Sequence, residues 1–115
     1  MAGIADNIQS TKNQLLGMHA SCPKSADERM FLVTVDLFTK YASAIMKIMK
    51  PIQGEDPLIK EIYEWAAGFF VFLEQPVTNQ AEMKQKLTTI IAKVKDELPK
   101  MLAKIQKLEE KFGTS

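Results

Sequence analysis

Two pairs of side chains in this chain have the spacing that chemistry needs. His19 and Cys22 stand three residues apart, as do Glu61 and Glu64. Such pairs share one face of an α-helix and could act together. However, a structural zinc site takes four ligands, and the chain has one His and one Cys. Paired carboxylates transfer protons only where they face a cavity that admits a substrate. Because Glu61 and Glu64 follow the polar side of their segment, we predict a solvated surface, with no catalytic residue, metal or cofactor.

A row of lysines near the carboxyl end suits a different chemistry, the binding of anions. Its members recur every seven residues or beside those positions, within a strip of about 60° on a straight helix. Such a strip could follow a nucleic-acid backbone or lipid head groups. Lysines beside an apolar seam are also typical of coiled-coil edges, where they pair with acids such as Glu61 and Glu64 opposite. We favour pairing, or a simple contribution to solubility, and keep a nucleic-acid-associated subunit as the alternative. The lysines are Lys86, Lys93, Lys100, Lys104, Lys107 and Lys111.

Large apolar side chains indicate a surface for another protein. Residues 57–74 carry an apolar arc close to half of the helix circumference, wider than the roughly 100° stripe of a helix with one neighbour. Aromatic residues concentrate binding energy at interfaces, so the arc supplies three expected anchors and the carboxyl end supplies four more. A carrier of an apolar ligand between helices is a further alternative. The expected partner-binding residues are Trp65, Phe69, Phe72, Met101, Ile105, Leu108 and Phe112.

The apolar periodicity predicts that four helices position these residues, at about 4–16, 26–50, 57–75 and 80–112. Gly17 stands where a carboxyl-terminal cap would end the first helix. Ser25 and Glu28 form a capping-box pattern for the second. Asp56-Pro57 is a strong start for the third, and Asn79 with Glu82 starts the fourth. Leu32 interrupts the polar side of the second helix, which suggests that the first helix or a partner covers it. The short connections favour an up-and-down four-helix bundle.

The last predicted helix has two unusual features, its length and an internal proline. Pro99 removes the hydrogen bond to the Lys95 carbonyl and forces a kink near that position. A helix over residues 80–112 would span about 45–50 Å, longer than any other segment. We therefore expect part of it either to fold back or to overhang the bundle. An overhanging apolar stripe would need a partner.

Composition sets the remaining limits. With 115 residues, 46% hydrophobic and 25% charged, the chain has the size and balance of one globular domain, residues 1–115. The net charge of +1 gives no general attraction to nucleic acid or membrane. With a single cysteine, no signal peptide and no apolar run long enough to span a bilayer, the expected location is the cytoplasm. We predict an all-α, non-enzymatic protein–protein interaction module, acting as a homo-oligomer or as a small subunit of a larger assembly.

Overall fold

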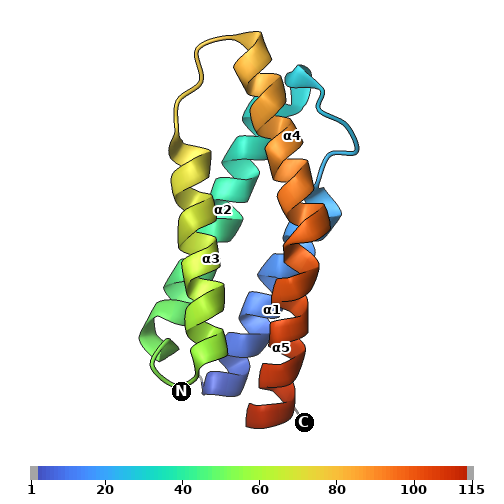
Figure 1. The fold of residues 1–115 in the computed structure, drawn as a ribbon. Helices are drawn as coiled ribbons and strands as arrows, with labels where there is room; N and C mark the ends of the chain where they lie inside the picture. The colour runs from blue at the N-terminus through green and yellow to red at the C-terminus, as the bar shows by residue number, and fades with distance from the viewer. Residues whose placement is uncertain (1–2, 114–115) are drawn as a thin grey trace.

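The computed structural model describes residues 3–113, which form an all-α bundle. The helices are α1 (Ile4–Ser21), α2 (Phe31–Met49), α3 (Pro57–Glu74), α4 (Gln80–Asp96) and α5 (Leu98–Phe112). Short 3₁₀ turns, η1 (Glu28–Met30) and η2 (Lys50–Ile52), precede and follow α2. Figure 1 shows that the chain runs up, down, up and down, with α4 and α5 forming the fourth rod. The up-and-down four-helix bundle predicted from the sequence is confirmed.

The kink predicted near Pro99 separates α4 from α5 at Glu97. Pro99 takes the second position of α5, where a missing N–H costs little because the N–H groups of the first turn of a helix have no acceptor within that helix. The chain therefore bends without ending the apolar stripe. Leu98 and Val94, on either side of the bend, are both buried.

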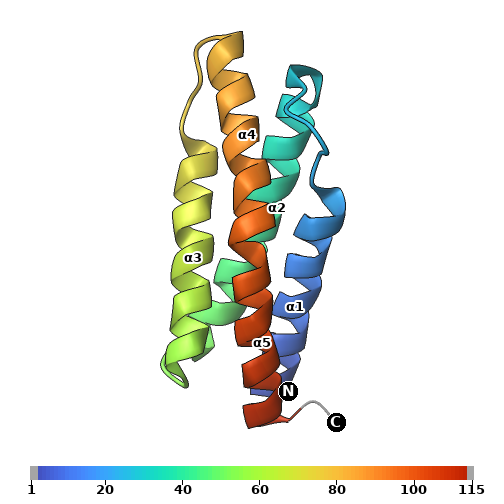
Figure 2. The same cartoon turned by 45° about the vertical axis from the view of Figure 1, so that its right-hand side comes forward.

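The length of the fourth rod is matched by its neighbours, so the expected fold-back or overhang does not occur. The molecule is 45 Å along its longest axis, and α4 and α5 together span it (Figure 2). Helix α1 packs beside α5, and η1 lies against α4. The segment between α1 and α2 therefore covers the part of the fourth rod that α1 does not reach. Seven residues of the apolar stripe are buried: Leu87, Ile90, Val94, Leu98, Met101, Ile105 and Leu108.

The core lies along the bundle axis and receives side chains from every helix. Phe38 of α2 and Phe69 of α3 are its largest fully buried side chains, with ring centroids 6.1 Å apart. Tyr41 meets the edge of Phe38 on the other side. The rest of this core cluster is aliphatic: Ile8, Leu15, Met18, Ala42, Ile45, Met49, Ile59, Ile62, Ala66 and Leu73, together with the buried stripe from Ile90 to Leu108.

Two helix ends differ from the sequence prediction. Helix α1 continues five residues beyond the predicted end, to Ser21, and Gly17 lies inside it. A Cβ at Gly17 would come within 2.7 Å of the Tyr41 ring, so this glycine admits Tyr41 to the α1 surface instead of capping the helix. Helix α2 begins at Phe31, because Asp27, and not Ser25, accepts a hydrogen bond at the start of η1. The caps at Asp56 and Asn79 form as predicted, and Gly113 caps the carboxyl end of α5.

Candidate functional site

The lysine row faces α3, and its first member caps that helix. Lys86 is 6% exposed, and its Nζ donates hydrogen bonds to the carbonyl oxygens of Leu73 (2.9 Å) and Gln75 (2.5 Å). These carbonyls lie at the carboxyl end of α3, where the helix dipole is negative and acceptors lack partners. Burial lowers the pKa of the Lys86 ammonium, and the charge of Glu74 opposes that shift. Lys86 therefore fastens α4 to the end of α3.

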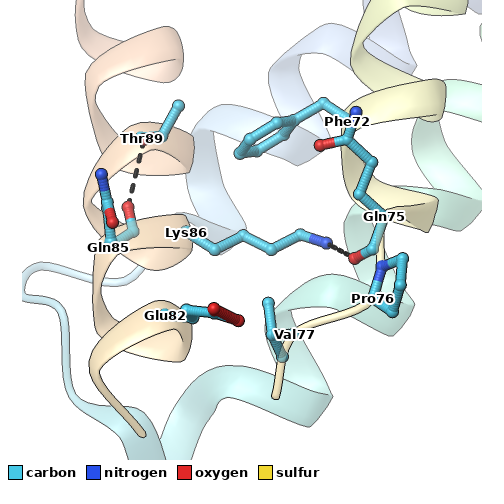
Figure 3. Close-up of a pocket in the computed structure, with 8 residues that line it drawn as sticks. All are labelled: Phe72, Gln75, Pro76, Val77, Glu82, Gln85, Lys86 and Thr89. Carbon is cyan, nitrogen blue, oxygen red and sulfur yellow. Dashed lines mark hydrogen bonds between the residues drawn. The ribbon is translucent and has the colours of Figure 1, made fainter. Parts of the chain in front are cut away.

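A cavity of about 310 Å³ opens around Lys86, between the end of α3 and the beginning of α4. Figure 3 shows the Lys86 side chain crossing this cavity, with the Phe72 ring on one side and Val77 on the other. The Lys86 Nζ lies 5.4 Å from the centroid of the Phe72 ring, within the range of a cation–π contact. The ammonium is thus engaged by backbone oxygens and by an aromatic face.

A second cluster ties α3 to the kink. The indole N–H of Trp65 donates to the Glu97 carboxylate over 2.8 Å, and Lys93 Nζ lies 3.4 Å from the same oxygen. Lys93 also sits 5.5 Å from the ring centroid of Phe69. A charged acceptor strengthens the indole hydrogen bond. Trp65, which we expected to anchor a partner, is therefore partly buried and engaged within the chain.

Two further lysines form ion pairs with the α3 segment. Lys104 lies 3.4 Å from Glu61, so pairing between the lysine row and the acids of the third helix is confirmed at this position. Lys111 reaches Asp56, the amino-terminal cap of α3, with an Nζ to Oδ2 distance of 2.5 Å. Within residues 3–113, Lys100 and Lys107 are exposed and make no ion pair. Four of the six lysines thus bind the chain itself, and they do not form a free cationic strip.

Most of the residues expected to bind a partner belong to the interior. Phe69, Ile105 and Leu108 are at most 1% exposed, and Met101 is 8% exposed. The other three, Trp65, Phe72 and Phe112, are partly buried and pack against the core. A partner cannot reach the fully buried ones while the bundle is closed.

The residues with catalytic or metal-ligating chemistry are dispersed. His19 and Cys22 line a cavity of about 290 Å³ beside Pro99, but the described residues contain no cluster of three His, Cys, Asp or Glu side chains that could hold a metal. Burial raises the pKa of the Cys22 thiol, which disfavours the nucleophilic thiolate. Glu61 and Glu64 are both exposed on α3. None of the helices within residues 3–113 combines the length and apolar character needed to cross a bilayer.

Three of the five large apolar side chains that are exposed within residues 3–113 lie where α2 begins, which the sequence indicated only through Leu32. Leu32 is 78% exposed and Val33 is 62% exposed, and Met30, at the end of η1, is 44% exposed. Helix α1 does not cover Leu32, because it stops at Ser21, below this end of the bundle (Figure 2). We call Met30, Leu32 and Val33 the α2 end patch. Its rim carries charge from Arg29 and Asp36.

A shallow groove runs between α2 and α3 on the outside of the bundle. Met46 from α2 and Tyr63 and Phe70 from α3 line it, all partly buried. Tyr63 and Phe70 are apolar residues of α3, and their spacing in the sequence gave no sign that they would border an open groove. We call this the α2–α3 groove.

Comparison of the chain with protein-family models, with curated proteins and with solved structures found no match.

Proposed function

We propose that this chain is a non-enzymatic helical module that binds another protein through the α2 end patch, either as a homo-oligomer or as a small subunit of a larger assembly. The supporting observation is that the adjacent side chains of Leu32 and Val33 are 78% and 62% exposed. Single exposed apolar residues are common, but several within one short segment favour an interaction surface.

The position of the patch also supports this proposal. Leu32 and Val33 lie on the first turn of a helix whose buried face is already complete, from Phe31 to Met49. Their exposure therefore adds nothing to the packing of the bundle. Association would remove this apolar surface from water, and each Å² that is buried would stabilise the complex by roughly 25 cal/mol.

Solution mass tests the proposal, by light scattering after size-exclusion chromatography over a hundredfold range of concentration. We expect wild-type chains to associate and the variant Leu32→Ser/Val33→Ser to be monomeric. Because both side chains are exposed, the free energy of unfolding should change by no more than about 0.5 kcal/mol per site. Val71→Ser is the matched control, since Val71 is 60% exposed on α3, outside the patch.

If the wild type is a monomer at every concentration, self-association is excluded, and the expected partner is a different protein. Affinity purification would then compare the wild type, the double variant and Val71→Ser. The proposal expects at least one protein to be recovered by the wild type and by Val71→Ser but lost with the double variant. Identical recovery by all three chains would contradict it.

A further inference from the structure

The α2–α3 groove has the size of a socket for one side chain. Its volume is about 210 Å³. Small-molecule sites usually occupy about 300–1,000 Å³, whereas a cavity of about 150 Å³ already holds a benzene ring. The groove therefore fits a single aromatic or large aliphatic side chain better than a whole cofactor.

The lining of the groove separates apolar from charged groups. Met46, Tyr63 and Phe70 supply its apolar surface, and Lys47 and Lys50 stand on the α2 side. Both lysines are exposed and form no ion pair within residues 3–113, in contrast to Lys104 and Lys111 of the lysine row. No Asp or Glu lines the groove. Its charge is therefore positive and available to an incoming group.

The spacing of the two lysines suggests the form of the partner. Lys47, on the last turn of α2, and Lys50, the first residue of η2, are three residues apart, and both line the groove. A partner helix repeats its side chains at the same interval. One large apolar residue could enter the groove while carboxylates one turn away met the lysines, which is the helix-in-groove mode of recognition.

We infer that the α2–α3 groove binds an acidic amphipathic helix of another protein, which inserts one aromatic or large aliphatic side chain beside Met46, Tyr63 and Phe70 and pairs its carboxylates with Lys47 and Lys50. The inference rests on the proposed function only in treating the chain as a protein-binding module. Its residues are separate from the α2 end patch, so either surface can fail without the other.

A matched set of three synthetic peptides tests the inference. The first is a helical peptide with one Trp and with Glu residues one turn to either side. The second replaces each Glu by Gln, and the third replaces Trp by Ala. Each is titrated into the full chain while the methyl signal of Met46 and the ring signals of Tyr63 and Phe70 are followed by NMR.

We expect the acidic Trp peptide to shift these signals and to bind more weakly as salt rises, because exposed ion pairs are screened. The Gln peptide should bind about three- to tenfold more weakly, since two exposed ion pairs are lost. The Ala peptide should show no saturable binding. Equal affinity for the Glu and Gln peptides, shifts confined to another surface, or no binding at 1 mM peptide would each overturn the inference.

Variants of the chain provide the reciprocal test. Lys47→Gln/Lys50→Gln should weaken binding of the acidic peptide by about the same three- to tenfold. Lys24→Gln/Lys84→Gln makes the same change of charge at exposed positions outside the groove and should have little effect. Ser43→Gln keeps the apolar lining but adds bulk at the groove, and it should also reduce binding.

Two controls separate this inference from the proposed function. Leu32→Ser/Val33→Ser should bind the acidic peptide like the wild type, whatever it does to association. If wild-type self-association is abolished by Ser43→Gln but not by the patch variant, a second copy occupies the groove, and the inference of an acidic helix from another protein is wrong.

Discussion

The structural role of Lys86 comes from the groups that it contacts and not from its position in the lysine row. Its Nζ bonds two carbonyl oxygens at the end of α3. The sequence places Lys86 in a row of similar lysines and gives no sign of this role. The role arises because α4 passes beside the last turn of α3, and that is a property of the whole bundle.

We predict that Lys86→Met lowers the free energy of unfolding by about 1–3 kcal/mol, because two buried carbonyls lose a charged donor. Lys84→Met is the control, since Lys84 is exposed two residues earlier on α4. It should change stability by no more than about 0.5 kcal/mol. Urea unfolding followed by circular dichroism measures both values. Equal effects would mean that the Lys86 cap contributes nothing.

The ionisation of the Asp56 carboxyl makes the stability of the fold depend on pH. The hydrogen bond from Lys111 and that from the Leu58 N–H hold the pKa of this carboxyl below its ordinary value of 3.8. In the unfolded chain the same carboxyl binds a proton more readily. Its contribution is therefore complete above pH 3.8 and is lost as the pH falls through the lower pKa of the folded state.

We expect Asp56→Asn to be less stable than the wild type at pH 7, because Asn can still cap the helix but cannot pair with Lys111. The difference in urea midpoint should shrink below pH 3.8 as the wild type also loses the charge. Asp36→Asn, at an exposed position on α2, serves as the control for removing one carboxylate. A constant difference from pH 7 to pH 2 would contradict the assignment.

At the scale of the elements, the sequence predicts best what is local. The kink was predictable because Pro99 lacks an N–H whatever surrounds it. The start of α3 was predictable because Asp56-Pro57 acts within one turn. The end of α1 was not, because whether Gly17 ends a helix or lies inside it depends on Tyr41, 24 residues later. The sequence predicted that the lysine row would pair with acids such as Glu61 and Glu64, and Lys104 with Glu61 is one pair that forms.

The hydrogen bond from Trp65 to Glu97 is the contact that couples α3 to the kink. We predict that Trp65→Phe and Glu97→Ala each destabilise the bundle and that their effects are not additive, because either change removes this hydrogen bond. A double-mutant cycle should give a coupling free energy of about 1 kcal/mol, because residues in contact typically couple by 0.5–3 kcal/mol. The cycle requires urea unfolding of the wild type and the three variants. A coupling free energy near zero would show that Pro99 alone sets the bend.

At the scale of the whole molecule, the long fourth rod is explained by its neighbours. In the sequence, no other predicted helix is as long as residues 80–112. We therefore expected part of that helix to fold back or to overhang the bundle, and an overhang would have needed a partner. In the structure α1 covers α5, and η1 contacts α4 beyond the end of α1. Sequence periodicity shows which face of a helix is apolar, but not how two shorter segments combine to cover it. The expected anchors at Ile105 and Leu108 became core residues for this reason.

This arrangement predicts different outcomes for two aspartate substitutions on α5. Leu108 is fully buried, so Leu108→Asp places a carboxylate in the core and should cost about 3 kcal/mol or more. That is a large part of the 5–15 kcal/mol that usually stabilises a domain. Phe112, partly buried on the last turn, allows its replacement to reach water, and Phe112→Asp should cost about 1–2 kcal/mol. Thermal unfolding and light scattering distinguish a core residue from an interface residue. If Leu108→Asp kept the unfolding temperature of the wild type and only changed the solution mass, α5 would be bound to a partner and not to α1.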